Sequence, residues 1–217
     1  MDNLAPRVIY DTKINHKAKL IHNFTPKCAG SSVSAYLCEI APSDWEEFPK
    51  INYLTDSKDI PDGYTIISTI RHPIPWMISG YRMQRQKGHI QMNFEEYCIW
   101  VAKGPSERYY NKHPAQFDDI WWHCGLLPDY HLVPGQKVFK LENIKELQKF
   151  IAGIYPHAKK IEFPVHNESF YDPKIKFTKK VQQAIRYKCG AYAQRFGYDL
   201  DFADRYIRTG VKKPHLL

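Results

Sequence analysis

The chain lacks the features that mark a secreted or membrane-spanning protein. Its first residues, Met1–Arg7, have neither the apolar core nor the order of charges of a signal peptide. The longest apolar stretch, around Tyr64–Ile70, is far too short to cross a bilayer. These absences predict a soluble protein of the cytoplasm with no membrane partner.

The cysteines show no paired spacing. The chain has five cysteines, an odd number, and none belongs to a Cys-x-x-Cys pair. This distribution is typical of reduced thiols rather than of a disulfide framework. His123, Cys124 and His131 lie close in sequence, but their spacing matches no common zinc-ligand pattern, so we expect no metal.

Internal repeats and low-complexity linkers are also absent. The 217 residues have an ordinary apolar content and suit a single domain over 1–217 with a substantial core. The formal net charge of +8 favours an anionic ligand. We do not expect nucleic acid as a partner, because the chain has no zinc finger, RNP motif or basic repeat, and acidic residues interrupt most basic clusters.

Hydrophobic periodicity predicts strands that alternate with helices, after a loose N-terminus. An acidic loop is expected between the first helix and the second strand. The expected strands are residues 18–24, 64–70 and 137–141. The expected helices are residues 31–41, 74–87, 93–103, 143–154 and 178–195. The alternation predicts an α/β fold with a doubly wound, mainly parallel sheet, in which ligands bind beyond the carboxyl ends of the strands.

The most informative segment is His22–Val33, which joins the first predicted strand to the first predicted helix. A proline and a glycine end the strand, and the hydroxyls of Ser31 and Ser32 are expected to cap the helix. A helix start presents backbone N–H groups at the positive end of its dipole, which suits a phosphate. Lys27 adds a cation, so the segment predicts an anion site.

This loop differs from a Walker A sequence, in which the lysine follows the last glycine. Here Lys27 precedes Gly30, and no later strand ends in an evident magnesium-holding aspartate. The order Pro-Lys-x-x-Gly-Ser-Ser over Pro26–Ser32 instead resembles the 5′-phosphosulfate loop of sulfotransferases.

A second segment resembles another element of the same family. Arg71 directly follows the predicted buried strand, and Ser79 lies about two turns along the next helix. The order strand, Arg-x-Pro, helix, Ser-x-Tyr resembles the element in which an arginine and a serine bind the 3′-phosphate of the donor, 3′-phosphoadenosine 5′-phosphosulfate (PAPS). The two segments in this order identify the chain as similar to PAPS-dependent sulfotransferases with a P-loop-like fold.

Two weaker similarities lie downstream. Lys137–Asn143 resembles the family's late strand that ends in Glu-Asn, and Phe196–Tyr198 resembles its C-terminal Phe-Gly-Tyr. The resemblance spans about residues 18–198, leaves 199–217 as a tail, and is closest to the carbohydrate sulfotransferases of the heparan and chondroitin type.

The sequence departs from the family pattern at two places. Cys28-Ala29 stands where the loop commonly has Thr-Gly or a similar small pair, which leaves the backbone cradle intact. Tyr192 stands where the family usually has an aspartate one turn before Phe-Gly-Tyr, which puts the packing partner of that helix in question.

The resemblance implies transfer of a sulfuryl group from PAPS to a hydroxyl of a glycan or small-molecule acceptor, without a metal. Lys27 is the implied catalytic cation. The implied donor-binding residues are Pro26, Lys27, Cys28, Ala29, Gly30, Ser31, Ser32, Arg71 and Ser79. Related enzymes place a Glu or His base shortly after the first helix, where this chain has Glu46 and Glu47. Only one of these adjacent carboxylates can be the base, because their side chains point different ways.

Other candidate site residues each have a functional and a structural interpretation. His113 resembles the first residue of a His-x-x-Gln element on the acceptor side, and Trp121 with Trp122 suits either sugar stacking or core packing. His22 and His72 are either close to the donor or local hydrogen-bond partners.

Two alternatives to a sulfotransferase stay open. A P-loop kinase would need magnesium ligands that the sequence does not show. A nucleotide-binding or glycan-binding module without turnover would not need Lys27 at the loop.

Overall fold

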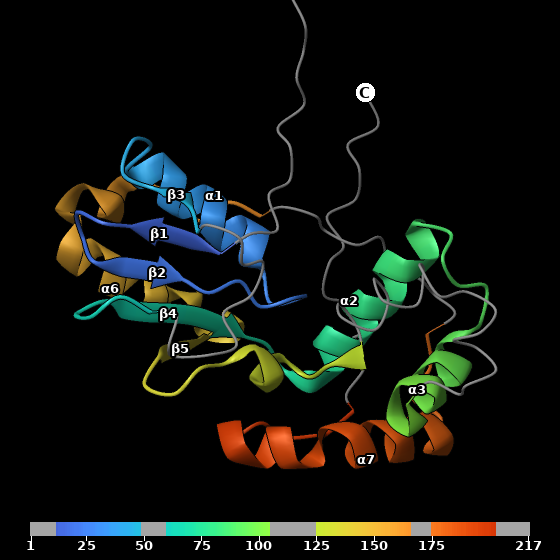
Figure 1. The fold of residues 1–217 in the computed structure, drawn as a ribbon. Coiled ribbons are helices and arrows are strands. Elements are labelled where there is room, and N and C mark those ends of the chain that lie inside the picture. The colour runs from blue at the N-terminus through green and yellow to red at the C-terminus, as the bar shows by residue number, and fades with distance from the viewer. Residues whose placement is uncertain (1–11, 49–59, 105–124, 166–174, 203–217) are drawn as a thin grey trace, which may run out of the picture. The chain divides into compact units, whose positions relative to one another are not determined.

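The computed structural model describes residues 12–48, 60–104, 125–165 and 175–202 (Figure 1). The chain forms two compact units. The first comprises Met1–Ile70 and Pro128–Asn167, and the second comprises Arg71–Leu127 and Glu168–Leu217. The prediction of a single domain over the whole chain stays a prediction.

The first unit contains a five-stranded sheet and its helices. The strands are β1 (Lys13–Asn15), β2 (Leu20–His22), β3 (Glu46–Glu47), β4 (Thr65–Ile70) and β5 (Lys137–Lys140). The α-helices are α1 (Gly30–Ile40) and α6 (Ile144–Ile154), with short 3-10 helices at Pro128–His131, Leu141–Asn143 and Pro156–Lys160. The predicted strands and helices of this unit are confirmed, and none of their ends differs by more than two residues.

The sheet has the order β3-β1-β2-β4-β5. β4 lies parallel to both β2 and β5, whereas β1 is antiparallel to β2 and to β3. Four of the five strands therefore run in one direction, and helices flank the sheet. The predicted α/β class with a mainly parallel sheet is confirmed. The predictions of a loose N-terminus and of an acidic loop missed β1 and β3, the antiparallel edge.

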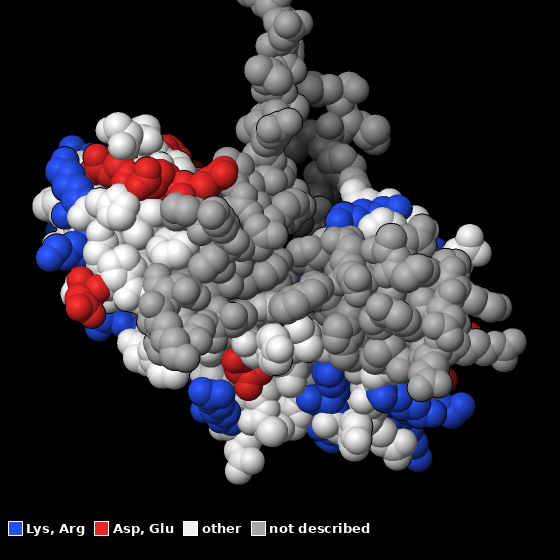
Figure 2. Space-filling model, viewed as in Figure 1, with Lys and Arg blue, Asp and Glu red and all other residues white. Residues whose placement is uncertain are grey.

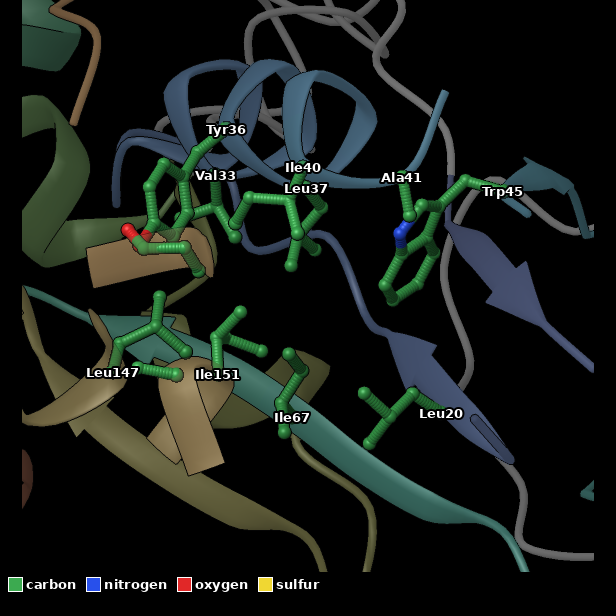
Figure 3. Close-up of a cluster of buried hydrophobic side chains, with 12 residues drawn as sticks. Leu20, Val33, Tyr36, Leu37, Ile40, Ala41, Trp45, Ile67, Leu147 and Ile151 are labelled. Carbon is green, nitrogen blue, oxygen red and sulfur yellow. The ribbon is translucent and has the colours of Figure 1, made fainter. Parts of the chain in front are cut away.

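Alternating side chains of the strands bury the two faces of the sheet. Leu20 and Ile67 join Leu37 of α1 and Ile151 of α6 in one apolar cluster (Figure 3). Their neighbours in the strands, exemplified by Ile21, belong to a second cluster on the opposite face. This period of two buries both faces of the central strands, and the prediction that the strand at 64–70 is buried is confirmed.

The described part of the second unit contains three α-helices. They are α2 (Pro73–Gln86), α3 (Phe94–Lys103) and α7 (Lys179–Phe196), and α7 packs against both others. The apolar stripe of α7 is buried at Val181, Ile185, Cys189 and Tyr192 and partly buried at Phe196. Basic side chains gather over α7 at the lower edge of Figure 2. Lysine and arginine on this helix therefore account for part of the net positive charge.

Candidate functional site

The loop between β2 and α1 has an unusual backbone. Lys27 and Ala29 adopt left-handed conformations, with φ of 61° and 63°. Left-handed residues other than glycine are uncommon, and they cluster where a backbone is held for function. Left-handed residues in a short loop are also typical of backbone nests, in which N–H groups converge on an anion. The backbone therefore supports the predicted anion site.

Gly30 opens α1 because a side chain would not fit there. A Cβ at this position would lie 2.4 Å from Cε2 of the Phe24 ring, and that ring is buried. The first turn of the helix thus packs directly on the residue that leads into the loop. This close approach holds the helix start next to the loop backbone.

The predicted caps of α1 are wrong. Ala29 is the N-cap residue, and no side chain makes a capping hydrogen bond; Ser31 and Ser32 lie inside the helix. The sequence favoured serine because serine is a strong cap, but the left-handed turn starts the helix one residue earlier. Because no capping side chain accepts from the first turn of α1, its backbone N–H groups can bind an anion.

Hydroxyl groups of β4 hold the loop in place. Ser68 Oγ donates to the carbonyl of Asn23 at 2.7 Å and lies 2.7 Å from Thr25 Oγ1. Because the Ser68 hydrogen goes to the carbonyl, Thr25 is the donor to Ser68. Thr69 Oγ1 donates to the carbonyl of Cys28 at 2.6 Å. Neither Ser68 nor Thr69 was predicted to have a role, although two buried hydroxyls among the isoleucines of β4 were the available signal.

His22 lies at the end of β2 and is completely buried. Its Nδ1 lies 3.2 Å from Ser34 Oγ on α1, and its Nε2 has no hydrogen-bond partner among the described residues. Burial, with a smaller contribution from the charge of Lys13, lowers the pKa of His22 to about 3. The ring is therefore neutral and shielded from solvent at physiological pH, which favours a structural role over that of a base.

In the second unit, the start of α2 is fully capped. His72 Nδ1 accepts from the N–H of Ile74 at 3.2 Å, and Trp76 N–H donates to the His72 carbonyl at 3.0 Å. The two remaining positions of the first turn are Pro73 and Pro75, which have no N–H. Unlike α1, this helix start has no backbone donor left, so an anion here must be bound by side chains.

Arg71 and Ser79 are the side chains that the sequence predicted for this role. Arg71 directly follows the last residue of β4 and is partly buried. Ser79 lies nearly two turns into α2, with 8% of its surface exposed. The hydroxyl of Tyr192 on α7 donates to the Arg71 carbonyl at 2.8 Å. His72, by contrast, is occupied as the helix cap, which is the local role considered for it.

The two candidate bases form β3 at the edge of the sheet. Glu47 lies 3.5 Å from the ammonium group of the buried Lys13. Glu46 lies 2.8 Å from His16 Nε2, and both of these side chains are exposed. The strand thus turns the adjacent carboxylates to opposite faces of the sheet, as expected for a period of two.

The remaining candidates lie largely beyond the described residues. His113, Trp121, Trp122, His123 and Cys124 all fall outside them. Within the described part of the chain, no three His, Cys, Asp or Glu side chains gather in a group that could hold a metal ion. No described helix is both long and apolar enough to span a membrane.

Comparison with known proteins connects these features to one family. A model of the sulfotransferase family matches residues 10–191, a range that includes the loop, the Arg71 segment and both candidate bases. No curated protein and no solved structure matches the chain significantly.

Proposed function

The chain belongs to the sulfotransferase family, and we propose that it moves a sulfuryl group from PAPS to a hydroxyl of a carbohydrate acceptor. The loop between β2 and α1 is the observation that carries the proposal. It combines two left-handed residues, an uncapped helix start and Lys27 at the carboxyl end of a parallel strand. This is the position at which α/β sheets bind phosphate groups.

The donor has two anionic ends, and different residues are proposed for each of them. The loop Pro26–Ser32 binds the 5′-phosphosulfate through backbone N–H groups and Lys27. Arg71 and Ser79 bind the 3′-phosphate through their side chains, because the start of α2 has no backbone donor to offer. The two ends are thus recognised by different chemistry.

The proposed reaction forms one S–O bond and breaks another. The acceptor oxygen attacks the sulfur, the bond from sulfur to the phosphate oxygen breaks, and the hydroxyl proton passes to a carboxylate. The products are a sulfate ester and adenosine 3′,5′-bisphosphate (PAP). Negative charge builds on the leaving phosphate oxygen, and a lysine positioned there stabilises it. The protein residues supply this charge stabilisation without a metal.

A thermal melt tests the donor class without knowledge of the acceptor. PAP should raise the melting temperature in the absence of metal, and ATP with magnesium should raise it less. A ligand at 100 times its Kd adds about 2.7 kcal/mol to the free energy of unfolding, which is a rise of roughly 5–10 °C for a chain of this size. ATP occupies the loop but offers only a hydroxyl to Arg71, so one charged contact is lost.

The opposite pattern would identify a kinase. A shift that requires ATP with magnesium, together with no shift for PAP, contradicts the proposed sulfotransferase activity. Shifts with PAP but no turnover on any acceptor would instead favour the binding module without catalysis.

The 3′-phosphate site has its own test in calorimetry with PAP and with 5′-AMP. We expect Arg71→Ala to weaken PAP binding about 10- to 100-fold and Ser79→Ala about 3- to 10-fold, because charged hydrogen bonds contribute more than neutral ones. Binding of 5′-AMP should change little in both variants. Arg85→Ala, at the exposed far end of α2, is the matched control and should leave both affinities unchanged. Equal affinity of the wild type for the two nucleotides would rule out a 3′-phosphate site.

The acceptor is proposed from the resemblance to carbohydrate sulfotransferases. Incubation of the protein with radiolabelled donor and a panel of glycans, tyrosine peptides and small alcohols identifies the acceptor class. Label transferred only to tyrosine peptides or small alcohols would contradict a carbohydrate acceptor while keeping the donor assignment.

A further inference from the structure

The carbonyl of Arg71 cannot obtain a donor from the helix that follows it. Pro73 and Pro75 have no N–H, and the N–H of Ile74 is bonded to the His72 ring. The next N–H, that of Trp76, donates to the His72 carbonyl. A donor for the Arg71 carbonyl must therefore come from elsewhere in the chain, because a buried carbonyl without one is destabilising.

Tyr192 supplies that donor from α7. Its hydroxyl donates to the Arg71 carbonyl at 2.8 Å, across 121 residues of sequence, and its side chain is 1% exposed. The ring lies against those of Phe196 and Tyr198, with centroids 5.1 and 6.0 Å away. Packing against these two rings restricts the Tyr192 ring, so its hydroxyl holds the Arg71 backbone at a defined point.

The segment after α7 makes a second connection to the same site. Gly197 adopts a left-handed conformation with φ of 62°, and Tyr198 N–H donates back to the Ala193 carbonyl at 2.8 Å. This turn brings the Tyr198 ring to 5.1 Å from the His72 ring. The carbonyl of Asp199 then accepts from His72 Nε2 at 2.6 Å.

These contacts define the protonation state and the tautomer of the His72 ring. Its Nδ1 accepts from a backbone N–H while its Nε2 donates to a carbonyl, so the ring is neutral with its hydrogen on Nε2. Both ring nitrogens are used, one to start α2 and one to attach α2 to the end of α7. The C-terminal end of α7 thus fixes two consecutive residues, Arg71 and His72.

We propose that Tyr192 is a positioning residue for the 3′-phosphate site. By holding the Arg71 carbonyl, it fixes the backbone from which the guanidinium group reaches the donor, and the connection from His72 to Asp199 fixes the next residue. This inference rests on the proposed function, in which Arg71 binds the 3′-phosphate. It also gives Tyr192 a role that an aspartate cannot fill, because a carboxylate accepts hydrogen bonds and does not donate one to a carbonyl.

Tyr192→Phe tests the proposal, because it removes the hydroxyl and retains the packed ring. Calorimetry should show PAP binding weakened about 3- to 10-fold, the loss of one buried hydrogen bond, with 5′-AMP binding unchanged within twofold. Tyr97→Phe is the matched control, a fully buried tyrosine of α3 in the same compact unit, and should leave the ratio of the two affinities at its wild-type value.

A second variant approaches the same site from His72. Asparagine is a favoured helix cap, so His72→Asn retains an acceptor for the N–H of Ile74 but is too short to replace the bond to Asp199. We expect the same selective loss of PAP affinity. A melting temperature measured for each variant separates this effect from general destabilisation, which would weaken binding of both nucleotides.

The outcomes distinguish this inference from the proposed function. If Tyr192→Phe keeps the wild-type ratio of the affinities for PAP and 5′-AMP, the positioning role is overturned and the 3′-phosphate site is not. An equal loss of affinity for both nucleotides also overturns it, since that result indicates a structural role. A wild type that does not discriminate overturns the 3′-phosphate site itself, and the positioning role with it.

Discussion

Lys27→Ala should lower kcat for sulfuryl transfer by about 10²–10³-fold while the protein folds normally. Removing one preorganised charge at a developing anion typically has this effect. Lys27 has a left-handed backbone with φ of 61°, and alanine meets the same steric restriction there as lysine does. The substitution therefore removes the ammonium group and leaves the backbone conformation of the loop comparably favourable. Single-turnover rates with the acceptor found in the radiolabel screen measure the effect.

The turn between β1 and β2 offers a matched control for this variant. Lys19 is also a left-handed lysine, with φ of 50°, but it is exposed and lies at the opposite end of β2 from the loop. Lys19→Ala removes the same charge from the same kind of backbone position and should retain wild-type kcat. If both variants keep full turnover, Lys27 has no part in the transition state.

The sequence predicted the helices and the parallel strands because their apolar residues repeat with a clear period. The stripe of α1, from Val33 to Ile40, and the run of β4 are buried as expected. Strands β1 and β3 were missed because they are three and two residues long. The turn between β1 and β2 also lacks the usual hairpin signal, since Lys19 occupies a left-handed position where glycine or asparagine is typical.

The role of the loop and of the Arg71 segment in donor binding stays a prediction, and the interactions that hold these residues were not predicted from the sequence. Thr69 and Cys28 are 41 residues apart, and Tyr192 and Arg71 are 121 apart. Such contacts depend on how strands and helices pack, and neither hydrophobic periodicity nor secondary-structure propensity predicts them. The departure at Tyr192 was visible in the sequence, but its hydrogen bond to a carbonyl required the structure.

The register of the sheet places the two candidate bases, between which the sequence did not choose, on opposite faces. Glu47 pairs with Lys13, which pairs with His22 at the carboxyl end of β2, so these three residues share one row and one face. Adjacent strands lie about 4.8 Å apart, which places the Glu47 backbone roughly 10 Å from that of His22, where the loop begins. Glu46 faces the opposite side of the sheet and contacts His16, in the turn at the far end of β1.

Glu47→Gln should therefore lower kcat by about 10²–10⁴-fold, the usual range for loss of a general base, and Glu46→Gln should retain wild-type turnover. An amide cannot accept the proton of the acceptor hydroxyl, whereas an exposed carboxylate away from the reaction is replaceable. Both variants should bind PAP with wild-type affinity, since neither residue belongs to the two phosphate sites. The two substitutions are identical and adjacent, and they differ in the face of the sheet and in the partner, which is the buried Lys13 for Glu47 and the exposed His16 for Glu46. Full activity in Glu47→Gln would exclude it as the base, and a loss confined to Glu46→Gln would place the acceptor on the other face.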